Sequence, residues 1–171
     1  MKKLIILFAF LVGTLGFTHA QKFAIVDMEY ILKHVPAYES ANEQLNQVSK
    51  KWQSEVEEKM QVVQNLYKTY QTEVVFMSPE MKTKRENEIV DKEKATQDLK
   101  KKYFGPEGEL YKKRQSLMKP IQDEVYNAIQ TLSNDKGYQL VLDKSSAMNI
   151  IFSSPRIDIS DDVLVKLGYS K

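Results

Sequence analysis

The sequence predicts an α+β protein, predominantly α, in which a long antiparallel coiled-coil hairpin of helices projects from a small β-rich body. Two observations predict the hairpin. Apolar residues recur at coiled-coil spacing from Tyr38 to Met77, and a helix-start signal interrupts the pattern at Ser78. The third observation concerns the body: strand-like segments occur near both ends of the chain, so they must meet in one place.

The N-terminal segment is typical of a secretory signal peptide. Two lysines precede an apolar run from Leu4 to Val12, which is shorter than the ~20 residues of a membrane-spanning helix. The chain has no cysteine, so no lipid can be attached at the expected cleavage site between Ala20 and Gln21. We therefore expect residues 1–20 to be removed and the mature protein to be soluble and exported.

Composition excludes several classes of function. The chain has 25 Lys and Arg against 23 Asp and Glu, and Lys2 and Lys3 leave with the signal, so the mature chain is formally neutral. Strong nonspecific binding of nucleic acid or anionic membrane needs uncompensated basic residues, and nucleic acid is therefore not an expected partner. The absence of cysteine excludes a disulfide framework, thiol catalysis and cysteine-ligated metal.

The first part of the mature chain predicts a strand, a short helix and a long one. Residues 23–28 are expected to form the strand, and the helix that follows is expected to end at Pro36. Apolar residues then recur at steps of three and four, which indicates a coiled-coil seam with a stutter around Trp52. The predicted seam residues are Tyr38, Ala41, Leu45, Val48, Trp52, Val56, Met60, Val63, Tyr67, Tyr70, Val74 and Met77.

A second long helix is predicted to start directly after the first. Ser78 is a suitable N-cap, Pro79 suits the first helical position, and an acid follows in the first turn. The chain must therefore fold back, with the tip of the hairpin near residue 78. Pro36 and Pro120 are equally distant from Ser78 in sequence, so the hairpin, residues 37–119, has arms of ~60 Å.

The return arm contains a predicted break at residues 103–109. Gly105 is expected to cap the first half of the arm, and Pro106 is expected to restart the helix. Counting from the tip places this break opposite the stutter. The aromatic residues that we expect to cluster there and brace a bend are Trp52, Tyr103 and Phe104.

The C-terminal part predicts the rest of the body. A helix continues after Pro120, strand candidates follow at residues 138–143 and 148–153, and Ser160 is expected to cap a short final helix. The body comprises residues 21–36 and 120–171.

A core of this size is marginal alone, and a small open sheet exposes unpaired edges, so we expect a homo-oligomer assembled through the body. The candidate oligomerisation residues are Phe23, Ile25, Leu140, Leu142, Ile150 and Phe152.

The ordered blocks FAIVDMEYIL, a long charged hairpin, GYQLVLDKSSAMNIIF and DISDDVLVKLG closely resemble the OmpH-like (Skp) family of periplasmic chaperones over essentially the whole mature chain. The resemblance implies a homotrimer with a shared barrel-like β body, whose helical arms enclose a cavity that holds unfolded outer-membrane proteins. It implies the periplasm of a Gram-negative bacterium, and no cofactor, metal or catalysis. Well-known members are distinctly basic, whereas this chain is neutral, which puts binding of lipopolysaccharide or a membrane surface in doubt.

The apolar run before the tip has two interpretations. Successive helical residues point about 100° apart, so Val75 and Phe76 cannot face the seam together with Val74 and Met77. The candidate client-binding residues are Val75, Phe76, Met77 and Met81, which would form an adhesive spot for unfolded chains. Alternatively, the run is a small cluster that closes the end of the hairpin. The seam tyrosines Tyr67 and Tyr70 are expected to face the partner helix rather than clients.

No constellation of residues indicates an enzyme. Asp27 and Asp143 are expected to be strand-end caps, because no serine elbow or phosphate-binding loop accompanies them, and His34 alone makes no metal site. Interleaved acids make the lysines of the return arm a solvated face. The function expected from the resemblance is an ATP-independent holding chaperone. The alternative is a structural coiled-coil adaptor of the cell envelope, which usually needs longer β segments on both sides of its hairpin.

Overall fold

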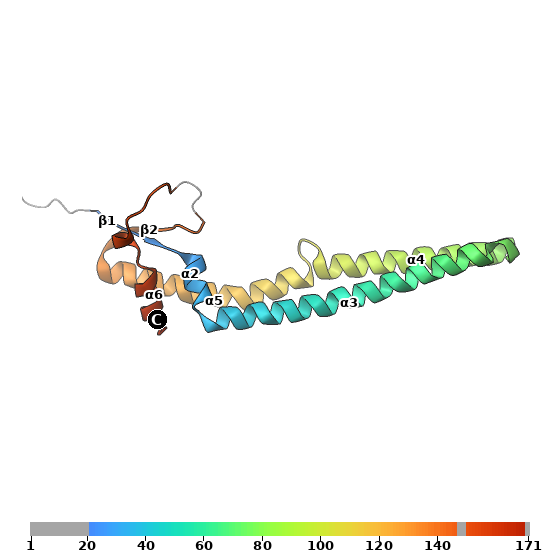
Figure 1. Cartoon of the computed structure of the whole chain (residues 1–171), viewed down its shortest axis with the longest axis horizontal. Helices are drawn as coiled ribbons and strands as arrows, with labels where there is room; N and C mark the ends of the chain where they lie inside the picture. The colour runs from blue at the N-terminus through green and yellow to red at the C-terminus, as the bar shows by residue number, and fades with distance from the viewer. Residues whose placement is uncertain (1–20, 147–149, 170–171) are drawn as a thin grey trace, which may run out of the picture. The chain divides into compact units, whose positions relative to one another are not determined.

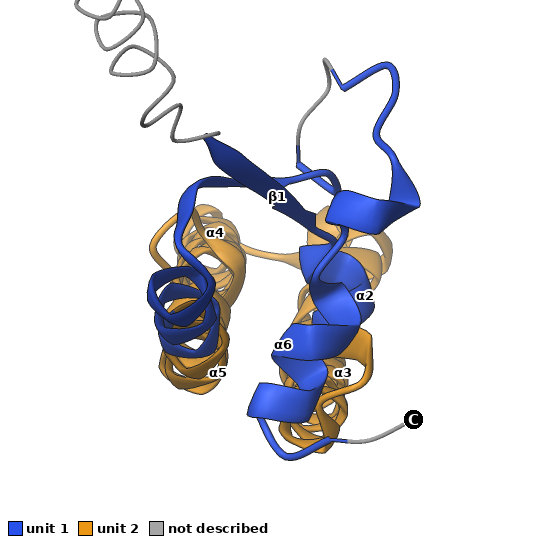
Figure 2. Ribbon diagram, turned by 90° about the vertical axis from the view of Figure 1, so that its left-hand side faces the viewer, with its two compact units in different colours: residues 1–31, 127–171 blue, residues 32–126 orange. Residues whose placement is uncertain are grey.

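The computed structural model describes residues 21–146 and 150–169, so the predicted signal peptide lies outside the described residues. The chain is mainly helical with a small two-stranded sheet, which confirms the predominantly helical α+β class (Figure 1). It divides into two compact units, shown in Figure 2: unit 1 comprises residues 1–31 and 127–171, and unit 2 comprises residues 32–126. The elements in chain order are β1 (Lys22–Val26), α2 (Met28–Lys33), α3 (Pro36–Glu73), η1 (Val74–Phe76), α4 (Pro79–Phe104), α5 (Glu109–Lys136), β2 (Tyr138–Asp143), η2 (Pro155–Ile157) and α6 (Ser160–Lys166).

Unit 2 contains a hairpin of two long helices, α3 and α4, and the first part of α5. Helices α3 and α4 run side by side (Figure 1), and the short 3-10 turn η1 joins them. Ser78 caps α4, because its hydroxyl accepts a hydrogen bond from the Met81 N–H at 3.3 Å, and Pro79 occupies the first helical position. The short helix α2 ends at Lys33, ahead of Pro36, as expected. Pro36 itself begins α3, whose first turn has no need of the missing N–H.

The predicted seam forms, with two exceptions. Ala41, Leu45 and Val56 of α3 are buried. Met60 and Tyr67 remain 44% and 52% exposed, so their placement in the seam was wrong. Helix α4 offers few large apolar side chains to cover them, and its buried residues are Ile89 and Thr96. A seam that is apolar on one helix and mostly polar on the other closes only in part.

The break in the return arm lies where it was predicted. Helix α4 ends at Phe104, and Gly105 takes the C-cap position with its N–H bonded to the Lys101 carbonyl at 2.8 Å. Pro106 does not restart the helix, because α5 begins only at Glu109. A turn intervenes, closed by the Gly108 N–H on the Gly105 carbonyl at 2.9 Å. A Cβ atom at Gly108 would lie 2.7 Å from the carbonyl oxygen of Tyr103, so only glycine fits this close approach.

Unit 1 is built around β1 and β2, which pair in parallel with Phe23 opposite Leu140 and Ile25 opposite Leu142. A parallel pair requires a long crossover, and the intervening chain supplies it. Helix α5 runs through Pro120 and ends before Gly137, whose φ of +72° lets the chain turn directly into β2. The core of this unit comprises Ala24, Ile25, Val26, Ile31, Ala128, Leu132, Ile159, Val163 and Leu164.

The third predicted strand is not found among the described residues. Met148 and Asn149 lie outside them, and residues 150–153 form no strand. The chain instead turns away after β2, because the Asp143 carboxylate accepts hydrogen bonds from the Ser145 N–H and hydroxyl at 2.9 and 2.7 Å. The other edge of β1 is occupied by an isolated bridge between Ile25 and Asp158. Ile151 and Phe152 are left exposed.

Candidate functional site

The hairpin tip exposes a group of apolar side chains. Val75 and Phe76 are 74% and 88% exposed, and Met81, at the start of α4, is 56% exposed. Met77 lies between them and is half-buried. The tight 3-10 geometry of η1 directs the side chains of Val74, Val75 and Phe76 to different sides, so these three cannot all enter the seam.

These exposures bear on the two interpretations of the run. A cluster that closes the end of the hairpin would bury its members, whereas Val75 and Phe76 are among the most exposed apolar residues of the described chain. The exposures therefore favour the client-binding interpretation, which stays a prediction. Val74 and Met77 are half-buried, as their seam spacing predicted. The tip presents apolar surface to solvent at the end of a largely polar helix pair.

An aromatic brace joins the two helices of the hairpin. The rings of Trp52 and Tyr103 stack with centroids 4.7 Å apart, and Phe104 meets Tyr103 edge-on at 6.3 Å, which confirms the predicted cluster. The Tyr103 hydroxyl also donates to Glu55 Oε2 at 3.0 Å, and this bond raises the pKa of Tyr103. Nearer the tip, the Tyr70 hydroxyl donates to Glu86, which raises the pKa of Tyr70.

The sheet of unit 1 has one partly uncovered face. Paired residues of parallel strands point to the same side, so the register brings Phe23, Leu140 and Leu142 together, each between 44% and 48% exposed. We call these three residues the sheet face. Ile25 shares this side but is 4% exposed and belongs to the unit's own core. The remaining candidates lie beyond the sheet: Ile150 is half-buried and Phe152 is 84% exposed.

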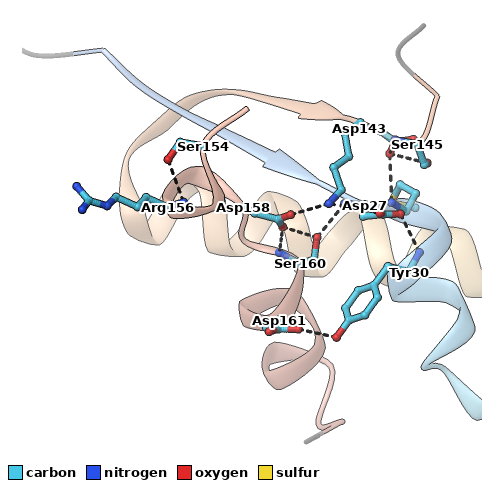
Figure 3. Close-up of polar contacts among 11 residues, drawn as sticks. Asp27, Tyr30, Asp143, Ser145, Ser154, Arg156, Asp158, Ser160 and Asp161 are labelled. Carbon is cyan, nitrogen blue, oxygen red and sulfur yellow. Dashed lines mark hydrogen bonds and ion pairs between the residues drawn. The ribbon is translucent and has the colours of Figure 1, made fainter. Parts of the chain in front are cut away.

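A polar cluster, which sequence reasoning did not find, joins three segments of unit 1 (Figure 3). Lys144 Nζ lies 2.9 Å from Asp158 Oδ2 and 3.4 Å from Asp27 Oδ2. The Ser160 hydroxyl accepts from the Asp27 N–H at 2.8 Å and donates to Asp158 Oδ1 at 2.6 Å. We call these four residues the clasp. They connect the ends of β1 and β2 to the start of α6.

The clasp changes the expected role of Ser160. Ile159, not Ser160, takes the N-cap position of α6, and Ser160 is the first helical residue. The Ser160 N–H donates to Asp158 Oδ1 at 3.0 Å, so the aspartate accepts from one of the N–H groups that have no partner within the helix. The sequence signal that could have revealed this is the spacing of Asp158 and Ser160, in which an aspartate precedes the helix by two residues.

Hydrogen bonding explains the pKa shifts in and beside the clasp. Partial burial pushes the pKa of Asp158 upward, but hydrogen bonds from Ser160 and Lys144 outweigh it and leave that pKa below its ordinary value. The pKa of Asp143 is lowered in the same way, with burial opposed by Ser145 and Ser146. The hydrogen bond to Asp158 raises the pKa of Lys144. These groups are therefore held in their charged forms.

Asp27 and Asp143 behave as strand-end caps, as predicted. Asp27 Oδ1 accepts from the Tyr30 N–H at 2.9 Å, and Asp143 Oδ1 accepts from the Met28 N–H at 3.1 Å. Among residues 21–146 and 150–169, no group of three or more His, Asp or Glu side chains is placed to hold a metal ion. Within the same residues, no helix has the length and apolar character needed to cross a membrane.

One comparison with known proteins shows the family of this chain. The model of the family described as outer membrane protein (OmpH-like) matches residues 22–167. Among solved structures, an OmpH-like protein from Caulobacter crescentus, described as an outer membrane chaperone, superposes with a TM-score of 0.68. The two chains are 14% identical, and the match covers 88% of this chain and 86% of the other, so this likeness concerns the fold. No curated protein matches the chain.

The family match spans β1, the whole hairpin, β2 and α6, and so includes both units and every element described above. The chain belongs to the OmpH-like family.

Proposed function

We propose that this protein is an ATP-independent holdase chaperone of the periplasm, which binds unfolded outer-membrane proteins and prevents their aggregation. The observation that carries this proposal is the apolar tip of the largely polar hairpin, where Val75, Phe76 and Met81 are exposed and Met77 is half-buried. Exposed apolar groups of this kind mark interaction surfaces in soluble proteins. Membership of the OmpH-like family supports the same activity.

The outgoing helix adds further apolar surface. Met60, Val62 and Tyr67 of α3 are about half exposed, whereas Val90 is the exposed large apolar residue in the middle of α4. Scattered apolar groups among charges give many weak contacts, which hold an unfolded chain without selecting one sequence. Such contacts exchange quickly, so the client is separated from other clients but remains able to leave.

The proposal includes assembly of a homotrimer through unit 1, with a cavity between the arms of three copies. The sheet face, Phe23, Leu140 and Leu142, supports assembly, because a two-stranded sheet with a half-exposed apolar face is marginal in water. Exposed Phe152 offers additional surface for a neighbouring copy. Closing the sheet with strands from other copies would remove its open edge.

The test uses a urea-unfolded outer-membrane β-barrel protein as the client. It is diluted into buffer with increasing concentrations of the mature protein, beginning at Gln21, and light scattering is recorded. We expect suppression that saturates near one oligomer per client. A protein of similar size and charge that lacks an exposed apolar tip serves as the control.

Undiminished scattering at several-fold excess would reject the holdase proposal. In that case, stoichiometric binding of one folded envelope protein would favour the structural adaptor. The periplasmic location is tested separately by fractionating cells and sequencing the N-terminus of the mature protein, which we expect to begin at Gln21.

A further inference from the structure

The hairpin contains a hollow between its two helices, well away from the tip. Its volume is about 360 Å³. The residues that line it are Met60, Val63 and Gln64 of α3, and Glu93, Thr96, Gln97 and Lys100 of α4. We call this hollow the notch.

The notch follows from one small residue in the seam. Thr96 is 8% exposed and occupies a position where a coiled coil would normally place a large apolar side chain. Its hydroxyl donates to the carbonyl of Lys92 at 2.7 Å, which satisfies the buried polar group within its own helix. The space that a leucine would fill is left open, and Met60 on the facing helix stays 44% exposed.

The lining combines an apolar floor with a polar rim. Met60 and Val63 supply the apolar part, while Gln64, Glu93, Gln97 and Lys100 are exposed. The amide groups, carboxylate and ammonium of these four side chains place both donors and acceptors at the rim, as the backbone of an extended peptide requires.

Size and chemistry point to an aromatic ring as the occupant. A cavity of about 150 Å³ holds a benzene molecule, so the notch has room for a ring and part of the adjoining backbone. The thioether of Met60 makes favourable contacts with aromatic rings, and an ammonium such as that of Lys100 is attracted to a ring face. An aliphatic side chain would gain neither contact.

We propose that the notch binds one aromatic side chain of an extended, unfolded polypeptide. This inference rests on the proposed holding function and names the feature of the client that the arm recognises. Strands of outer-membrane β-barrels alternate apolar and polar residues and carry aromatic girdles, so unfolded barrel proteins supply many such segments. The tip offers general adhesion, and the notch adds a preference for aromatic residues.

The test follows the methyl resonance of Met60 in the mature protein labelled with [methyl-¹³C]methionine. The probes are two nine-residue peptides of Gly, Ser and Thr that differ only in a central Phe or Ser. We expect the Phe peptide to shift the Met60 resonance saturably and the Ser peptide to leave it unchanged. Thr96→Leu, which fills the notch, should weaken the binding of the Phe peptide roughly tenfold.

Thr83→Leu is the matched control. Thr83 lies on the same helix and makes the same kind of bond, from its hydroxyl to the Pro79 carbonyl at 3.1 Å, but it is exposed and does not line the notch. This variant should bind the Phe peptide as the parent does. If Thr96→Leu fails to fold, the Met60→Ser variant replaces it. Peptide binding is then followed by the ¹⁹F resonance of 4-fluorophenylalanine at the central position of the peptide, and we expect the same roughly tenfold weakening.

The proposal would be overturned if the Phe peptide left the Met60 resonance unmoved, if both peptides shifted it equally, or if the parent and Thr96→Leu bound the Phe peptide equally well. It would also be overturned if the Met60 resonance shifted with protein concentration alone, because a second copy of the chain would then fill the notch. The scattering assay separates these outcomes from the holding function. Suppression of aggregation with an unmoved Met60 would reject only the notch. A saturable Met60 shift without suppression would reject only the holdase.

Discussion

The indole of Trp52 and the phenol ring of Tyr103 stack with centroids 4.7 Å apart and planes 4° from parallel, although the two residues are 51 positions apart in sequence, on either side of the hairpin tip. The contact lies beside the turn in which α4 ends and α5 has not yet begun. It therefore joins the two arms at the point where one of them loses its continuous backbone hydrogen bonding.

Replacing Tyr103 with Ala should destabilise the hairpin by about 1–2 kcal/mol, because stacked aromatic pairs contribute beyond the area they bury. Urea unfolding followed by circular dichroism measures the change. Tyr111→Ala, at a half-exposed tyrosine of α5, is the control. Equal losses in the two variants would mean that the stack contributes nothing of its own.

Gly108→Ala should cost about 1–3 kcal/mol, the usual range for forcing an extra methyl group into a packed site. The new Cβ would lie within 3 Å of backbone atoms of Lys102, Tyr103 and Gly105, none of which can move alone. The neighbouring exposed residue provides the control, Glu107→Ala. Thermal unfolding that is unchanged in Gly108→Ala would show that the turn relaxes freely.

Substituting the tip should weaken client holding without altering the fold. In Val75→Ser with Phe76→Ser, we expect the concentration for half-suppression of scattering to rise roughly tenfold, since the transfer energy of a large apolar side chain is lost. Val165→Ser, at a 69% exposed residue of α6, is the control. Unchanged suppression in the double variant would remove the tip from the client-binding surface.

Placing charge on the sheet face should dissociate the oligomer. In the double variant Leu140→Glu with Leu142→Glu, two carboxylates replace neighbouring apolar groups that we assign to the contact between copies. Burying unpaired carboxylates in that contact would cost more free energy than the contact can supply. Sedimentation velocity should then detect the monomer, whereas Val165→Glu should sediment as the parent does. A parent chain that is monomeric at micromolar concentration would contradict the assembly itself.

The clasp and the neighbouring Asp143 should give unit 1 a defined pH dependence. The lowered pKa values of Asp143 and Asp158 mean that their contributions are present above the unfolded pKa and are lost as pH falls through the folded one. The raised pKa of Lys144 means that its contribution is present below the unfolded pKa and is lost as pH rises through the folded one. Stability should thus fall below about pH 4 and above about pH 10.

Lys144→Met should lower the free energy of unfolding at neutral pH by about 1 kcal/mol, the upper end for partly exposed ion pairs. It should also remove the alkaline loss. Lys166→Met, which breaks the more exposed pair with Asp135 at 3.4 Å, is the control and should change little. Chemical unfolding at several pH values tests both statements, and a steeper alkaline loss in Lys144→Met would contradict them.

Local chemistry made most of the hairpin predictable. The seam spacing, the Ser78 cap and the Gly105 cap depend on residues near one another in sequence, and all are observed. The meeting of Trp52 with Tyr103 followed from counting positions on either side of the tip. Where the composition of the partner helix mattered, prediction failed: Tyr67 fits the seam by spacing but finds too little apolar surface opposite.

The body was less predictable, because its contacts join distant residues. The apolar segment at Ile151 and Phe152 has strand-like composition and is exposed. A strand also needs a neighbouring strand with which its backbone can pair, and composition does not predict which segment that is. The clasp escaped notice for the same reason, since Lys144 and Asp27 meet only when β1 and β2 are paired. Pro106 shows a further limit, because a proline suited to starting a helix instead lies in a turn that Gly108 shapes.

The parallel pairing of β1 and β2 has a consequence for the order of folding. The contact of Met28 with Asp143 closes a loop of 115 residues, which is entropically unfavourable in an unfolded chain. The contacts of the hairpin close progressively from its tip, so it can form first and shorten the effective loop. Because a chain is synthesised from its N-terminus, β1 is made long before β2, and we expect it to remain unpaired until the hairpin has folded.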